Sequence, residues 1–146
     1  MTDTQSLYEK DYALWLDRTI ADLKAKRLEA IDWQNLIEEV EDLSRRERQE
    51  LKSRLTNLLE HIIKRSYISL PECYRGWVNT IVREQQEIES LLSDSPSLIN
   101  IFNQIINVCW SNARKRVLRE YDEVDLPLEY PFPCDPDRLL NDTFWE

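Results

Sequence analysis

Two glutamates and the single histidine of the chain are the residues whose types fit a metal site. Glu38 and Glu41 are spaced i, i+3, which places both carboxylates on one side of a helix. Carboxylate and imidazole groups ligate divalent metals such as Mg²⁺ and Mn²⁺ or the transition metals. A di-iron helical bundle, however, requires two Glu-x-x-His pairs, and the residue three before His61 is Leu58. The sequence therefore does not favour a bound metal or cofactor. The candidate ligands for a metal site, the less favoured alternative, are Glu38, Glu41 and His61.

A fourth polar residue, Asp11, falls within an apolar helical stripe between Leu7 and Trp15. A buried carboxylate requires a partner or must be neutralised. We expect a structural hydrogen bond or ion pair here, in preference to a ligand site. Whether Asp11, Glu38, Glu41 and His61 form a site or a structural polar network stays open at this point.

Other catalytic and nucleic-acid-binding signatures are absent from the sequence. There is no Gly-x-Ser-x-Gly nucleophile motif, and one glycine in the chain leaves no glycine-rich phosphate loop. Arg45, Arg48 and Lys52 share a helix face, but acidic residues accompany them and the net charge is −9. Binding to nucleic acid or to an anionic membrane is therefore disfavoured, and a non-enzymatic role is preferred.

The acidic charge is concentrated at the C-terminal end. Residues 1–119 hold 19 acids and 18 bases, whereas residues 120–146 hold nine acids and one base, Arg138. Prolines recur after residue 126, and apolar side chains lie between them. We expect residues 122–146 to form an extended Pro-rich acidic arm that packs on the body through Phe144 and Trp145. Alternatively, these aromatic residues dock on a partner or on a second copy of the chain. The candidate partner contacts are Asp122, Glu123, Asp125, Phe144 and Trp145.

The elements that must position these residues are helices. Apolar residues recur with a period of about 3.6, and one glycine supports few tight turns. The predicted fold is all-α, a single-domain antiparallel helical bundle with a helical body of residues 1–121. We expect helices from Ser6, from Asp32 to Tyr67, over 73–92, from Ser95 to 121, and over 136–140. Ser44 and Glu47 match a capping box, which predicts a break near residues 42–44. The apolar residues on both sides of this break, among them Ile37, Val40, Leu43, Leu51 and Leu55, are expected to form one buried stripe.

The expected cellular location follows from the targeting, membrane-spanning and cysteine motifs that the sequence lacks. No apolar run approaches the roughly 18 residues of a membrane span, and residues 1–5 lack the parts of a signal peptide. Cys73, Cys109 and Cys134 form neither a C-x-x-C pair nor a disulfide framework, and Cys109 is expected in the core. We expect a cytoplasmic protein.

Several stretches together resemble the bacterial family called domain of unknown function 29. The resemblance implies an all-helical single domain, without an established activity and without catalytic residues to transfer. The matching stretches occur in order along nearly the whole chain: residues 7–15, 31–43, 58–64, Trp77, 81–85, 94–98, and the ending from Phe132-Pro133 to Phe144-Trp145.

Two functions follow as hypotheses. The first is a small helical protein that acts through protein–protein contacts, as an adaptor or a neutralising partner, motivated by the acidic aromatic arm on a charge-balanced body. The alternative is a metal-dependent enzyme with a carboxylate and histidine site between helices. Self-association through an exposed aromatic face is compatible with either.

Overall fold

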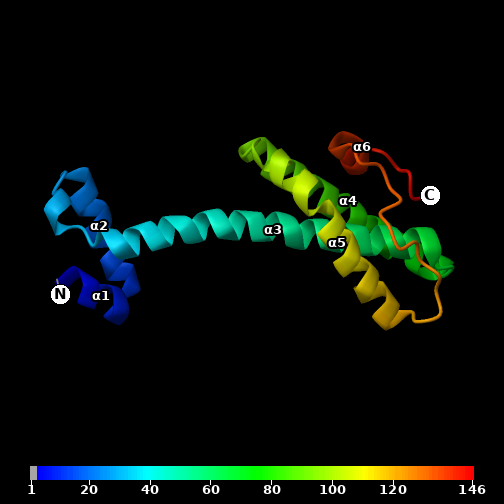
Figure 1. Ribbon diagram of the computed structural model, residues 1–146, viewed down its shortest axis with the longest axis horizontal. Coiled ribbons are helices and arrows are strands. Elements are labelled where there is room, and N and C mark those ends of the chain that lie inside the picture. The colour runs from blue at the N-terminus through cyan, green and yellow to red at the C-terminus, as the bar shows by residue number, and fades with distance from the viewer. Residues whose placement is uncertain (1–2) are drawn as a thin grey trace. The chain divides into compact units, whose positions relative to one another are not determined.

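The structure, a computed structural model, describes residues 3–146. Over this range it is mainly helical and contains no strand, which confirms the all-α prediction. Figure 1 shows the elements in chain order. They are α1 (Asp3–Lys10), α2 (Tyr12–Lys24), the 3₁₀ helix η1 (Leu28–Ala30), α3 (Trp33–Tyr67), α4 (Pro71–Asp94), α5 (Leu98–Glu120) and α6 (Pro136–Asn141).

Helix α3 is continuous over its 35 residues, so the predicted break near residues 42–44 is wrong. Ser44 lies in the helix interior, and α3 contains neither glycine nor proline to interrupt it. Arg45 pairs with Glu41 at 3.8 Å and also with Asp42, and such i, i+4 and i, i+3 pairs stabilise the helical backbone. The start of α3 was predicted correctly, since Asp32 accepts a hydrogen bond from the Asn35 backbone N–H at 3.3 Å.

The first helix differs from its prediction at both ends. It begins at Asp3, before Ser6, and it ends at Lys10. Asp11 then caps α2, because its carboxylate accepts from the Leu14 backbone N–H at 3.1 Å. Asp11 is exposed and is not the buried carboxylate that the apolar stripe predicted. The cap satisfies a free helix N–H locally and lets the chain change direction.

The start of α5 is displaced from its predicted cap. Pro96 and Ser97 form a turn that the hydrogen bond from the Leu98 N–H to the Ser95 carbonyl closes, and α5 begins at Leu98. Ser95 instead ends α4, and its hydroxyl donates a hydrogen bond to Glu47. The side chain therefore binds across elements and does not cap the helix that follows it.

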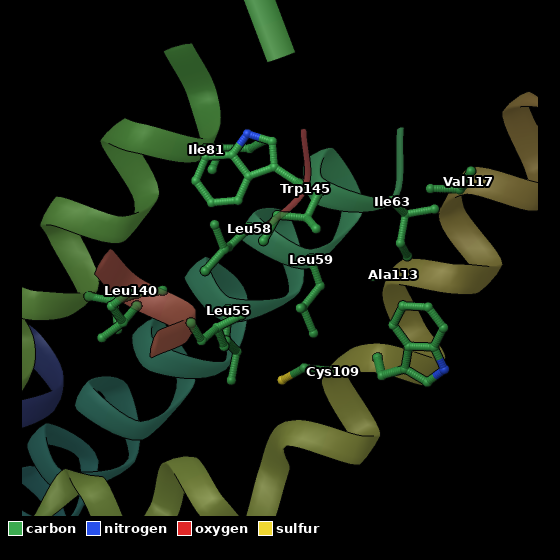
Figure 2. Close-up of a cluster of buried hydrophobic side chains, with 14 of the residues drawn as sticks. Leu55, Leu58, Leu59, Ile63, Ile81, Cys109, Ala113, Val117, Leu140 and Trp145 are labelled. Atoms are coloured by element: carbon green, nitrogen blue, oxygen red, sulfur yellow. The ribbon is translucent and has the colours of Figure 1, made fainter. Parts of the chain in front are cut away.

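The chain divides into two compact units, unit 1 (residues 1–46) and unit 2 (residues 47–146). Unit 2 holds one continuous apolar core (Figure 2). Its fully buried members come from α3, α4, α5 and the C-terminal segment. They are Leu51, Leu55, Leu58, Leu59, Ile62, Ile63, Ile81, Ile88, Cys109, Ala113, Val117 and Leu139. Cys109 is a core residue, as expected, and the three cysteines are free.

The C-terminal segment contributes its own side chains to this core. Residues 121–135 have no regular structure, and Asp135 caps α6 at the position that the Asp-Pro pair predicted. Gln85 from α4 donates to the Leu139 carbonyl at 3.0 Å, which supplies the partner that a buried amide requires. Arg114 and Trp110 from α5 donate to the carbonyls of Pro127 and Leu128, at 3.0 and 3.1 Å.

Candidate functional site

The predicted metal ligands do not come together. Glu38 and Glu41 belong to unit 1 and His61 belongs to unit 2. Glu41 and His61 are 20 positions apart in the same helix, α3. Across residues 7–146, whose side chains the structure describes, no group of three or more His, Cys, Asp and Glu side chains is arranged to hold a metal ion. The alternative of a carboxylate and histidine site between helices therefore has no geometric support.

His61 and its neighbours form a polar network on unit 2. The His61 Nδ1 atom lies 2.9 Å from the Asn57 carbonyl oxygen and 4.0 Å from the Glu60 carboxylate. The Lys64 ammonium lies 3.4 Å from Glu60 and 2.9 Å from Glu120. Burial opposes the charge of Lys64, but the hydrogen bond to Glu120 and the charge of Glu60 outweigh it and raise the pKa of Lys64. The same hydrogen bond lowers the pKa of Glu120. The network ties α3 to α5 as a set of paired charges.

An open groove of about 380 Å³ lies beside this network, where α3 and α5 both end. We call it the acidic groove. Its lining residues are Tyr67, Ile68, Ser69, Glu120, Tyr121, Asp122, Glu123 and Val124. The C-terminus of a helix carries a partial negative charge from its macrodipole. Two helix C-termini and the carboxylates of Asp122 and Glu123 therefore place negative charge at this groove, whereas the third carboxylate, Glu120, is paired with Lys64.

The five predicted partner contacts separate into two groups. Asp122, Glu123 and Asp125 are exposed, and the first two line the acidic groove. Trp145 is only 3% exposed and is part of the unit 2 core, as Figure 2 shows. Phe144 is half-buried, with its ring centroid 5.3 Å from that of Trp145. The aromatic pair is thus occupied within the chain, whereas the three carboxylates are accessible.

Unit 1 presents a surface of the opposite character. Among the side chains of residues 7–146, nine of the twelve exposed large hydrophobic ones belong to unit 1, whereas only Trp15 and Ile31 among the apolar side chains of unit 1 are buried. We call the nine the unit 1 apolar face. They are Tyr12, Leu14, Ile20, Leu23, Leu28, Trp33, Ile37, Val40 and Leu43. The prediction that Ile37, Val40 and Leu43 lie in a buried stripe is wrong, because they are 53%, 58% and 61% exposed.

Comparison with known proteins identifies a family. The family described as "Domain of unknown function DUF29" matches residues 7–145. The chain belongs to this family. No curated protein and no solved structure matches the chain. Membership in DUF29 confirms the resemblance found in the sequence and assigns no role to any residue.

Sequence reasoning found part of the acidic groove and missed the rest. The acidic run after Tyr121 was visible as a change in charge along the chain. Tyr67, Ile68 and Ser69 come from more than 50 positions earlier, and only the packing of α3 against α5 in unit 2 brings them to the same groove. In the part of the chain that the structure describes, no helix is long and apolar enough to cross a membrane.

Proposed function

We propose that this DUF29 chain acts through contact with another protein, as an adaptor or neutralising partner, and that the acidic groove binds a basic segment of that partner. The observation that carries the proposal is the exposure of Asp122 and Glu123 at a groove where two helices end. A Lys- or Arg-rich segment has the complementary charge for such a surface.

The composition of the groove supports a cationic ligand. No lysine or arginine is found among its lining residues within the described chain. Lys64, which lies nearby, is already bound by Glu60 and Glu120. Tyr67 and Tyr121 add aromatic rings, and a guanidinium or ammonium group over a tyrosine ring is attracted by cation–π interaction. A bound arginine would thus meet both carboxylates and ring faces.

The proposal includes an architecture and a location. The helices form an antiparallel bundle within a single domain, and the Pro-rich acidic arm of residues 122–146 packs on it and presents its carboxylates. The buried Trp145 supports this role for the arm, because it fixes the end of the chain in the core. We place the protein in the bacterial cytoplasm.

The test neutralises the groove without a change in chain length. The variant combines Asp122→Asn, Glu123→Gln and Asp125→Asn, and a quantitative pull-down from the source cells compares it with wild type. We expect recovery of the partner to fall by about tenfold or more at low salt, because an electrostatic contact depends on exposed charge. Added salt should weaken wild-type binding in the same direction.

A matched control changes the same net charge elsewhere in the C-terminal segment. Glu129→Gln, Asp137→Asn and Glu146→Gln also remove three exposed carboxylates, and none of them lines the acidic groove. This control should retain the partner, and circular dichroism should show equal helicity for all three proteins. Equal partner recovery from the groove variant and wild type would refute the proposal.

A further inference from the structure

Residues 136–146, which we call the strap, consist of α6 and the segment after it, and they pack on unit 2 with one apolar side. Leu139, Leu140 and Trp145 are buried and Phe144 is half-buried, whereas the charged residues of the strap are exposed. Figure 2 shows Leu140 and Trp145 among core side chains of α3 and α4, and α6 also packs against α5. A helix of six residues is not stable alone in water, so α6 depends on this packing.

Few polar contacts attach the strap to the helices beneath it. The Gln85 amide donates to the Leu139 carbonyl at 3.0 Å, and a serine of α3 donates to the Trp145 carbonyl at 3.4 Å. Among the described residues, the ion pair of the strap is internal, between Arg138 and Asp142 at 3.3 Å. The strap is therefore held on unit 2 mainly by its apolar side chains, as a peptide ligand is held by a few anchors.

One buried polar atom of the strap lacks a partner. The indole Nε1 of Trp145 is buried without a hydrogen bond, whereas the Trp110 indole donates to the Leu128 carbonyl at 3.1 Å. A buried N–H without an acceptor has lost its hydration without compensation. The ring of Trp145 thus favours the docked strap, and its N–H, which water would bind, favours release.

The chain before the strap provides a linker with its own attachment to unit 2. Residues 121–135 have no regular structure, and prolines recur within them. Arg114 of α5 donates to the Pro127 carbonyl at 3.0 Å, which holds the first part of this linker. The lining of the acidic groove ends at Val124, before this attachment. Release of the strap therefore leaves the acidic groove in place.

We propose that the strap is a detachable intramolecular ligand of unit 2. It leaves while α3, α4 and α5 stay folded, and the core surface that it covered then accepts the same segment from a second copy of the chain. The strap of a second copy makes the same contacts as the chain's own strap, so exchange between copies requires no new contact. A short amphipathic helix on an apolar surface is an established mode of peptide recognition.

The first test supplies the strap as a separate molecule. The probe is a fluorescent peptide of residues 134–146 with Cys134→Ser, and fluorescence anisotropy measures its affinity for the chain of residues 1–146. In this chain, Leu139→Asp weakens the chain's own strap, because it places a charge at a fully buried position. The variant should bind the peptide at least about tenfold more tightly than wild type, whose own strap occupies the surface. Equal affinity would overturn the proposal.

Matched controls separate the strap from its linker. Leu128→Asp places the same charge at a linker position that is 78% exposed, and this variant should bind the peptide as weakly as wild type. A peptide that carries Leu139→Asp should bind neither chain. Circular dichroism should show that the Leu139→Asp chain keeps its long helices. Loss of these helices would overturn the proposal, because the strap would then be an integral part of the core.

A second test uses hydrogen exchange and leaves the strap itself unchanged. In wild type, amides of α6 should be protected at least about tenfold less than those of residues 55–63, because the strap opens without the core. Gln85→Leu removes the donor to the Leu139 carbonyl, so it should speed exchange in α6 severalfold and leave residues 55–63 unchanged. Equal protection of α6 and residues 55–63, or exchange in α6 that ignores the Gln85 substitution, would overturn the proposal.

The outcomes are separate from those of the proposed partner contact. No strap residue lines the acidic groove. A failed pull-down with the groove variant would leave the peptide and exchange measurements unaffected, and a strap that stays docked would leave the partner contact unaffected.

Discussion

At the scale of single residues, Glu39 is the polar centre of unit 1. Its two carboxylate oxygens accept hydrogen bonds from the Tyr8 and Tyr12 hydroxyls, each at 2.6 Å. The bonds from Tyr12 and then Tyr8 lower the pKa of Glu39, and the bond to Glu39 raises the pKa of Tyr8 to about 12. Tyr8 belongs to α1, Tyr12 to α2 and Glu39 to α3. One ionised carboxylate therefore connects three helices within unit 1.

Replacement of this carboxylate should loosen α1 and α2. In Glu39→Gln, one charge-assisted acceptor is lost, and we expect backbone amides of α1 and α2 to exchange severalfold faster at pH 7. A lowered carboxyl pKa gives stability that is present above the unfolded pKa and is lost as the pH falls through the folded pKa. The difference from wild type should thus shrink below about pH 4. The raised pKa of Tyr8 has the opposite effect on the pH dependence of stability. Its contribution to stability is complete below about pH 10 and is lost as the pH rises through about 12.

Hydrogen exchange measured by mass spectrometry, corrected for the intrinsic effect of pH, provides this comparison. Glu38→Gln is the control, because Glu38 is the exposed neighbour on the same helix turn. Equal exchange in the two variants at pH 7 would show that the Glu39 bonds do not stabilise unit 1.

At the scale of elements, α3 shows that a helix can continue across a sequence that matches a capping box. A capping serine requires non-helical backbone angles at its own position and supplies one bond to a free N–H. The interior of a helix already satisfies these N–H groups by backbone bonds. Ser44 therefore stays helical, whereas Asp32, which follows the extended residue Ile31 and directly precedes α3, acts as the cap.

Two alanine variants distinguish a real cap from an apparent one. Ser44→Ala should stabilise the protein by about 0.5 kcal/mol, because alanine has the higher propensity in a helix interior. Asp32→Ala should destabilise it by about 1 kcal/mol, because a helix N–H loses its acceptor. Urea unfolding followed by circular dichroism measures both. A destabilised Ser44→Ala protein would mean that α3 starts a new helix at Ser44.

At the scale of the whole molecule, apolar burial is unequal between the units. Within the described chain, 20 of the 22 buried apolar residues belong to unit 2, and Trp15 and Ile31 are the two in unit 1. The hydrophobic effect is the main favourable term in folding and is proportional to buried apolar area. Unit 1 by itself therefore has little to offset the conformational entropy of its helices.

Hydrogen exchange should resolve this difference. We expect amides of α1 and α2 to be protected at least about 100-fold less than those of residues 51–63, because local opening of unit 1 exposes little apolar surface. Equal protection of both units at low concentration would contradict the prediction.

The sequence by itself determined the helical class and the starts of α3 and α6. The single glycine, the helical periodicity, Asp32 and the Asp135-Pro136 pair were sufficient, because helix formation and capping depend on residues within one or two turns. The family also followed from local stretches.

Only the tertiary structure decided which apolar residues are buried. Ile37 and Val40 belong to the same helix as Leu51 and Leu55 and are equally apolar, but the first two are exposed and the last two are fully buried. Periodicity tells which side chains share a face of a helix, whereas burial depends on whether another element covers that face. The acidic groove has the same origin, since residues from the ends of α3 and α5 meet there only through packing between distant parts of the chain.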